Sequence, residues 1–254
     1  MYPVLFRIGT FEVQSFWVTV VLGFSAAWVA MRAELQRIGR RPELAYDLIL
    51  WAYIGGFIGA RLFLIVTAWD VFVKDPFAFL FSGSGWVWQG GVLGGAVAVC
   101  LSARQHGLPL PEVTDGGALA LAIGQAIGRI GCQLAGDGDY GIPSSLPWAM
   151  SYPNGVVPTL ERVHPTPIYE MLLYFGIFIV LWRQRGRPRP AGNLFAQYLI
   201  YTGVARFAVE FLRINPRVAF GLTIPQVLSL VSILIGVVLY ARLLARPIAL
   251  PQSS

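Results

Sequence analysis

The chain has 254 residues, of which 56% are hydrophobic and only 13% are charged, and its formal net charge is +6 at pH 7. Soluble domains carry roughly 25% charged residues, so this composition excludes an ordinary water-soluble protein. The basic residues stand in short clusters between apolar segments, which argues against nucleic-acid binding and favours cytoplasmic loops beside anionic membrane lipids. We therefore expect an all-α integral membrane protein.

Because a spanning helix needs about 20 mainly apolar residues, the sequence predicts about seven transmembrane helices in one membrane-embedded domain over residues 1–254. In chain order they cover residues 16–31, 44–68, 87–103, 113–127, 167–182, 194–212 and 224–244. The fourth is short and Gly-rich, which is also compatible with a half-buried or re-entrant segment.

Charge sets the expected orientation of these helices. Eleven of the 19 basic residues follow the first, third, fifth and seventh predicted spans, and six lie on the other side. Loops rich in Lys and Arg stay cytoplasmic, so the N-terminus is expected outside and the C-terminus inside. The longest stretch between spans, 129–164, then forms an ordered cap on the outer side.

Histidine and cysteine are scarce. The two cysteines, Cys100 and Cys132, do not suggest a disulfide framework. The two histidines, His106 and His164, are predicted on opposite sides of the membrane, so we expect neither a metal site nor another cofactor.

A glycine-rich segment surrounds one arginine where the fourth span meets the outer loop. It reads Gly128-Arg129-Ile130-Gly131-Cys132 and continues into 136–141, which contains Asp137 and Asp139. Glycines let the backbone approach a bound group, and an arginine can grip a phosphate with a bidentate fork. The alternative is a Gly-rich turn with a snorkelling interfacial arginine.

The sixth predicted span carries Arg206 and Glu210. A spacing of four residues puts the two side chains on one helix face, where they can pair. Ionisable residues inside a membrane are costly and usually functional, but a structural ion pair that locks the helices together is the alternative.

A third segment, His164-Pro165-Thr166-Pro167-Ile168-Tyr169-Glu170, leads into the fifth span. Prolines suit the first turn of a helix, so Glu170 is expected about one turn inside the membrane. His164 is a candidate general base, and a hydrogen-bonded structural residue is the alternative.

The start of the third span, Gln89-Gly90-Gly91, combines a hydrogen-bonding side chain with small residues. This pattern fits a lipid-binding rim and fits a packing face of small residues equally well. Arg61 in the second span adds a cation near the same level.

Together these segments resemble the prolipoprotein diacylglyceryl transferase family over nearly the whole chain. The resemblance rests on the Gly-Gly start of the third span, Gly128-Arg129-Ile130-Gly131, the His164 to Glu170 stretch, the Arg206 to Arg213 stretch and Pro225-Gln226-Val227-Leu228-Ser229. It implies a seven-helix body with a periplasmic cap in the bacterial inner membrane, and a monomer is expected.

The reaction that the resemblance implies transfers the diacylglyceryl group of phosphatidylglycerol to the lipobox cysteine thiol of a preprolipoprotein signal peptide, with release of glycerol phosphate. Cations can stabilise the departing phosphate without a metal, and a base must generate the thiolate. The implied lipid-binding residues are Arg129, Arg206, Gln89, Gly90, Gly91 and Arg61. Glu210 orients Arg206, and Asp137 corresponds loosely to an acidic position of the family.

The chain departs from the family pattern at several positions. Gln89 stands where the family usually has a histidine that has been proposed as the base, and the signature continues as Cys132-Gln133 where Asn-Phe or Cys-Phe is usual. Either His164 or Asp137 therefore takes the role of the base, or the chain is a divergent paralogue with an altered substrate or no activity. A non-enzymatic phospholipid-binding or lipoprotein-handling protein on the same scaffold is the alternative function, and restoration of lipoprotein maturation in transferase-depleted cells distinguishes the two.

Overall fold

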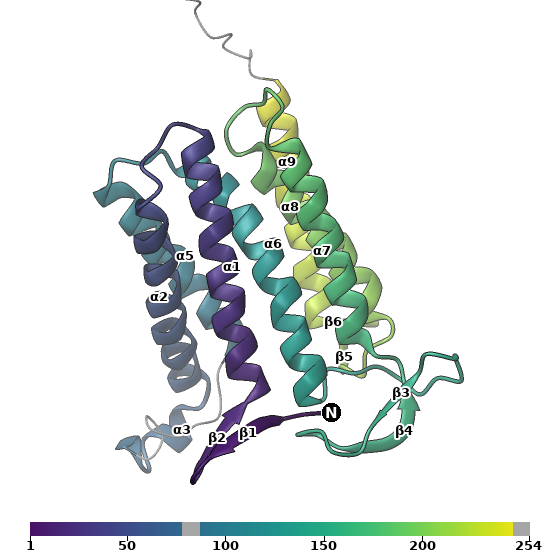
Figure 1. Cartoon of the computed structure of the whole chain (residues 1–254). Coiled ribbons are helices and arrows are strands. Elements are labelled where there is room, and N and C mark those ends of the chain that lie inside the picture. The colour runs from purple at the N-terminus through teal and green to yellow at the C-terminus, as the bar shows by residue number, and fades with distance from the viewer. Residues whose placement is uncertain (78–86, 246–254) are drawn as a thin grey trace, which may run out of the picture. The chain divides into compact units, whose positions relative to one another are not determined.

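The computed structural model describes residues 1–77 and 87–245 (Figure 1). Its helices are α1 (Ser15–Arg37), α2 (Leu44–Thr67), α3 (Trp69–Phe72), α5 (Trp88–Gln105), α6 (Leu110–Ala135), α7 (Thr166–Gln184), α8 (Asn193–Glu210) and α9 (Ile224–Leu244). Six short strands form three antiparallel pairs: β1 (Val4–Ile8) with β2 (Phe11–Gln14), β3 (Met150–Tyr152) with β4 (Thr159–Val163), and β5 (Arg217–Ala219) with β6 (Leu222–Thr223).

The helical membrane character expected from composition is confirmed. Five of the described helices, α1, α2, α6, α7 and α9, are long and apolar enough to cross a membrane. Helices α5 and α8 cover the third and sixth predicted spans with 18 residues each, but their polar side chains lower the mean hydropathy. The total of seven spans therefore stays a prediction.

Helix α6 differs from its sequence-based expectation. It runs for 26 residues from Leu110 to Ala135, so it is a full-length helix and not a re-entrant segment, and residues 129–135 of the expected cap are helical. Gly131 is a packing position, because a Cβ added to it would lie 2.1 Å from the Thr19 hydroxyl oxygen of α1, whereas a Cβ added to Gly128 would meet nothing within 4 Å. Glycines that resemble helix breakers in the sequence instead allow two helices to approach closely.

The chain divides into two compact units, which are described separately. The first unit contains Met1–Glu34 and Thr114–Ser254, and the second unit contains Leu35–Val113. The expectation of a single domain stays a prediction.

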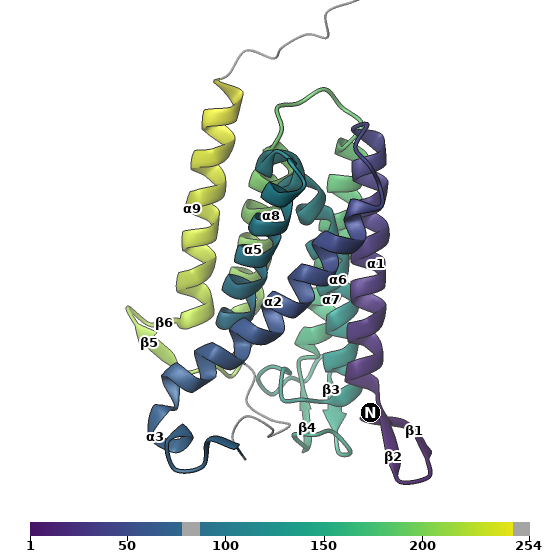
Figure 2. The same ribbon diagram turned by 90° about the vertical axis from the view of Figure 1, so that its left-hand side faces the viewer.

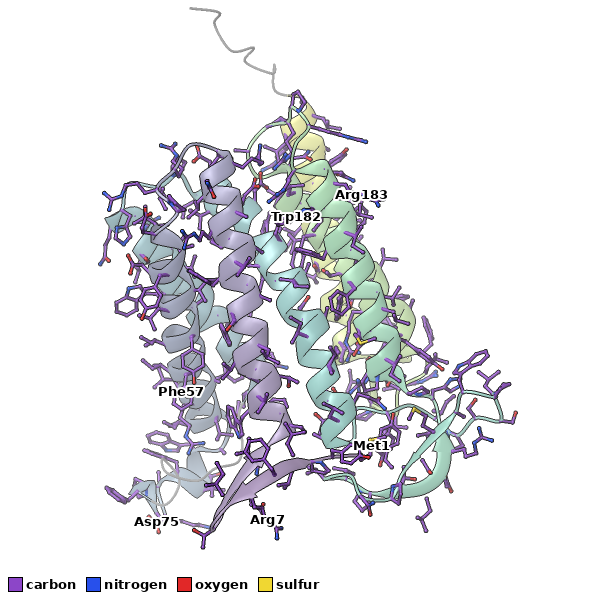
Figure 3. The ribbon with its side chains drawn as sticks, viewed as in Figure 1. Met1, Arg7, Phe57, Asp75, Trp182 and Arg183 are labelled. Atoms are coloured by element: carbon purple, nitrogen blue, oxygen red, sulfur yellow. The ribbon has the colours of Figure 1, made fainter. Side chains whose placement is uncertain are left out.

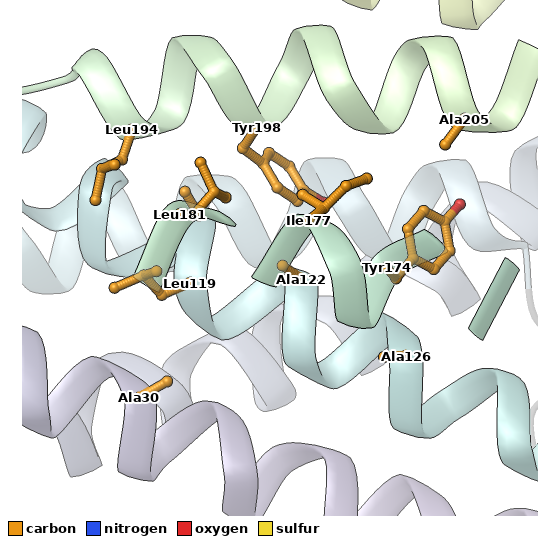
Figure 4. Close-up of a cluster of buried hydrophobic side chains, with 11 residues drawn as sticks. Ala30, Leu119, Ala122, Ala126, Tyr174, Ile177, Leu181, Leu194, Tyr198 and Ala205 are labelled. Carbon is orange, nitrogen blue, oxygen red and sulfur yellow. The ribbon is translucent and has the colours of Figure 1, made fainter. Parts of the chain in front are cut away.

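In the first unit, α6, α7 and α8 share a buried hydrophobic core (Figure 4). Leu119, Leu181 and Leu194 are fully buried there, and the Tyr198 hydroxyl donates to the Gln125 side-chain oxygen at 3.0 Å. The three β-hairpins lie at one end of this unit's helices, and the loop between α7 and α8 lies at the other end (Figures 1 and 2). This hairpin end positions the candidate site.

In the second unit, α2 and α5 pack through glycines. A Cβ added to Gly94 would lie 2.2 Å from the Gly55 carbonyl oxygen, and one added to Gly90 would lie 2.4 Å from the Gly59 carbonyl oxygen. The packing interpretation of the Gly90 region is therefore confirmed, and a lipid-binding role for Gly90 stays a prediction.

The contact between α2 and α5 predicts a position-specific response to one added methyl group. Gly94→Ala should destabilise the fold by roughly 1–3 kcal/mol, because the methyl group has no space against the α2 backbone. Gly117→Ala is the matched control, since a Cβ there meets nothing within 4 Å and helix propensity favours alanine by about 1 kcal/mol. Thermal unfolding in detergent measures both, and equal melting temperatures would contradict the close-packed contact.

Candidate functional site

Six charged side chains of the first unit gather at its hairpin end, where α6 and α8 finish and α7 begins. They are Arg129, Asp139, Glu170, Arg206, Glu210 and Arg213, called here the ionic cluster. Three guanidinium groups face three carboxylates, so the cluster is formally neutral. Buried charges persist only when they are paired in this way.

Glu170 lies at the centre of the ionic cluster, and its side chain is only 1% exposed. One carboxylate oxygen lies 2.8 Å from Arg129 Nε, and the other accepts a hydrogen bond from Arg206 Nη1 at 2.7 Å. Arg213 Nη1 is 3.8 Å away. Arg129 and Arg206, which come from α6 and α8, therefore meet on one carboxylate of α7, as expected for a shared anion-binding environment.

Glu210 holds the other side of Arg206. Their ion pair measures 2.8 Å across the four-residue spacing, so the pairing predicted from sequence is confirmed. The second Glu210 oxygen accepts from Asn215 Nδ2 at 2.7 Å and from the Thr223 hydroxyl at 2.8 Å. The same hydroxyl caps α9 by accepting from the Gln226 backbone N–H, so the start of α9 is tied to the ionic cluster.

Asp139 bridges two cations from the loop after α6. Its two carboxylate oxygens pair with Arg129 and with Arg213, one oxygen to each. Burial acts to raise the pKa of Asp139, but the two guanidinium groups outweigh burial and hold this pKa at about 2. Asp139 is therefore ionised at neutral pH and behaves as an anion bound by two arginines.

Cys132 and Asp137 adjoin the ionic cluster. The Cys132 sulfur lies 3.6 Å from Arg129 Nη1, and a carboxylate oxygen of Asp137 lies within 4.8 Å of that sulfur. Burial raises the pKa of Asp137, and the neighbouring Asp139 charge raises it further. A thiol thus already sits between a carboxylate with raised basicity and a cation.

Cys132, Asp137 and Asp139 are also the three side chains, within the described part of the chain, whose ligand atoms lie close enough to hold a metal ion. Asp139 is already saturated by two guanidinium groups. Those positive charges would oppose a metal cation at the same position.

His164 is held by neighbours in the cap segment. Its Nδ1 lies 3.2 Å from the Tyr169 hydroxyl, which accepts from Trp148 Nε1 at 2.8 Å. Tryptophan can only donate, so the tyrosine hydrogen is available for Nδ1, and a neutral ring then carries its own proton on Nε2. In that tautomer neither ring nitrogen offers a free lone pair, and a base role for His164 stays a prediction.

The remaining expected lipid-binding residues belong to the second unit. Arg61 is buried within α2, Gln89 is exposed in the first turn of α5, and Gly90 and Gly91 face α2. Their roles stay predictions.

Three members of the ionic cluster were not assigned a role from the sequence: Asp139, Glu170 and Arg213. Weak signals exist for each. Arg213 follows Glu210 by three residues, Glu170 ends the segment that begins at His164, and Asp139 stands in the Gly-Asp-Gly-Asp run.

Comparison with known proteins gives a consistent match. The family model described as prolipoprotein diacylglyceryl transferase matches residues 3–242. The chain is 36% identical over 258 residues to the phosphatidylglycerol–prolipoprotein diacylglyceryl transferase of Methylococcus capsulatus, covering 96% of each chain. It is 31% identical over 243 residues to the Clostridium tetani protein of the same name, covering 94% of this chain and 97% of the relative.

The central position of Glu170 predicts a large stability cost on its neutralisation. Glu170→Gln leaves two guanidinium groups without their shared counter-charge and should destabilise the fold by roughly 3–5 kcal/mol. Glu161→Gln on β4 makes the same change in net charge at an exposed site and should cost little. Denaturant unfolding in mixed micelles measures both variants. A Glu170→Gln protein as stable as Glu161→Gln would show that the ionic cluster does not support the fold.

Proposed function

The chain belongs to the prolipoprotein diacylglyceryl transferase family, and we propose that its ionic cluster is where it transfers the diacylglyceryl group of phosphatidylglycerol to a cysteine thiol of a prolipoprotein. The observation that carries this assignment is the meeting of Arg129 and Arg206 on Glu170. Two guanidinium groups from different helices form a rigid cationic pair, and such pairs suit a phosphate.

The chemistry follows from the bonds that change. The thiolate attacks the lipid carbon that carries the phosphate ester, the carbon–oxygen bond breaks, and glycerol phosphate leaves with the electron pair. Negative charge therefore grows on the phosphate in the transition state. Preorganised guanidinium groups in a site of low dielectric constant stabilise this charge most effectively.

Within this scheme Arg129 and Arg206 hold the phosphate, and Glu210 orients Arg206. Both arginines are partly exposed, at 23% and 20% of their side chains, so a ligand can reach them. Glu210 is fully buried and bound by Asn215 and Thr223, which suits a positioning residue.

We assign the base to Asp137 in preference to His164. The support for this choice is that Cys132 places a thiol close to the Asp137 carboxylate and beside Arg129. An incoming substrate thiol in the same surroundings would lose its proton to a carboxylate of raised basicity, while the cation stabilises the thiolate. The His164 ring is engaged by Tyr169 instead.

The proposed setting is a bacterial inner membrane crossed seven times, with the ionic cluster and the 129–164 segment on the periplasmic side. In this orientation the lipobox cysteine of a signal peptide arrives from the outer face, and the protein acts as a monomer. Figure 3 supports the polarity within the first unit: Met1 and Arg7 lie at the hairpin end, and Arg183 lies at the opposite end of α7, next to the arginine-rich segment that follows this helix.

Loss of the phosphate grip should abolish transfer. Arg206→Ala removes donors to the phosphate and should lower the rate of transfer to a lipobox peptide by roughly 100-fold to 1,000-fold or more. Arg183→Ala is the control of equal charge change, at an exposed position in the last turn of α7. The assay uses membranes that contain phosphatidylglycerol and is paired with rescue of transferase-depleted cells. Wild-type transfer by Arg206→Ala would refute the phosphate-grip assignment.

The base assignment predicts a specific pH profile. Transfer requires ionised Asp137, whose pKa lies above the ordinary aspartate value of about 3.9, so activity should fall with acid at a pH above that value. Asp137→Asn should lose most activity at every pH, and His164→Gln should retain it. Gln89→His, which restores the usual family residue, should not raise the rate. Activity that survives in Asp137→Asn but not in His164→Gln would place the base on His164.

A further inference from the structure

We infer that the Asp139 carboxylate takes the place of the substrate phosphate in the empty site, where it binds Arg129 and Arg213. The lipid headgroup displaces Asp139 when it binds. After the reaction Asp139 returns and helps to displace glycerol phosphate. The inference rests on the proposed function and adds a residue that sets the balance between lipid binding and product release.

The charges of the ionic cluster already balance one another. Arg129, Arg206 and Arg213 already face three carboxylates, so the ionic cluster has no uncompensated cation to offer. A lipid phosphodiester that simply added to this neutral cluster would bring one excess negative charge into a partly buried site. Such a charge is costly unless another anion withdraws. Binding must therefore be an exchange.

Of the three carboxylates in the ionic cluster, Asp139 is the one that withdraws. Asp139 is 28% exposed, whereas Glu170 and Glu210 are 1% and 0% exposed. Glu210 is held by two neutral donors besides its arginines, and Glu170 lies within α7 between the guanidinium groups. Asp139 is the carboxylate of the cluster that can turn toward water without leaving a buried charge behind.

The exchange requires movement of the Asp139 side chain but not of its main chain. The backbone carbonyl of Asp139 accepts from Arg213 Nη1 at 3.0 Å and from the Thr166 hydroxyl, so the main chain stays in place. Only rotation of a short side chain is needed to release the two guanidinium groups.

The Asp139 carboxylate resembles a phosphate in the way it binds two arginines. One Asp139 oxygen pairs with Arg129 and the other with Arg213, so the carboxylate bridges two guanidinium groups. Two oxygens of a phosphate can bridge the same pair, because arginine forks accept carboxylate and phosphate in the same bidentate manner. The empty site is thus already organised around an anion of the substrate's type.

The exchange also accounts for product release. When the sulfur–carbon bond forms and the carbon–oxygen bond breaks, the thiol proton passes to Asp137 and the phosphate gains a second negative charge. The three arginines then face two glutamates and a dianion, so the cluster carries an excess negative charge. Return of Asp139 to Arg129 and Arg213 displaces the dianion and restores the neutral cluster.

The test measures binding of inorganic phosphate and of glycerol phosphate to the full-length protein in detergent by calorimetry. Asp139→Asn removes the competing anion and should bind both probes roughly tenfold more tightly than wild type. Glu161→Gln, with the same change in net charge on β4, should match wild type. Equal or weaker phosphate binding by Asp139→Asn would overturn the inference.

Kinetics and stability separate this role from a merely structural one. Asp139→Asn should lower KM for phosphatidylglycerol and also lower kcat, because release of glycerol phosphate becomes slow. A loss of kcat without a lower KM would overturn the inference.

Should Asp139→Asn fold poorly, phosphate should raise its melting temperature more than that of wild type. An equal shift in the two proteins would count against exchange. Tighter phosphate binding together with wild-type protein that transfers no lipid would uphold the exchange and refute the proposed function.

Discussion

The buried carboxylate of Glu170 is the constraint on which the rest of the site depends. A guanidinium group near the end of a membrane helix is tolerated only with a counter-charge, and Glu170 serves Arg129 from α6 and Arg206 from α8 at once. One side chain of α7 therefore fixes the relation of three helix ends. Glu210 extends the same network through Thr223 to the first turn of α9. The fold and the proposed phosphate site therefore share the same ion pairs.

A cluster built in this way has a functional consequence. Its guanidinium groups are held rigidly by their carboxylates, which prepares them for a transition state at no further cost in reorganisation. The same pairing removes the free positive charge that would draw an anion to the site. Rigid positioning and ready attraction of phosphate therefore oppose each other here. A partly exposed carboxylate on a short side chain, such as Asp139, would reconcile them, because it can pair with the arginines in the empty site and be exchanged for a phosphate.

The sequence predicted most of what depends on local pattern, and it missed what depends on distant partners. Apolar runs located the long helices, and the four-residue spacing predicted the Arg206–Glu210 pair. The shared role of Glu170 follows from α6 and α8 meeting α7, which no spacing within one segment reveals. The length of α6 was underestimated because Gly131 resembles a helix breaker, although its lack of a side chain is what lets Thr19 of α1 approach.

The departure at Gln89 leaves the proposed transfer without the histidine that is usual in the family pattern. Another proton acceptor is then needed, and a carboxylate serves only if its basicity is raised. Asp137 has this property because burial and the neighbouring Asp139 charge disfavour its ionised form. Asp139 itself is kept ionised by two arginines. Two aspartates separated by one residue thus have opposite pKa shifts, which is the pattern expected where one accepts a proton and the other supplies a permanent charge.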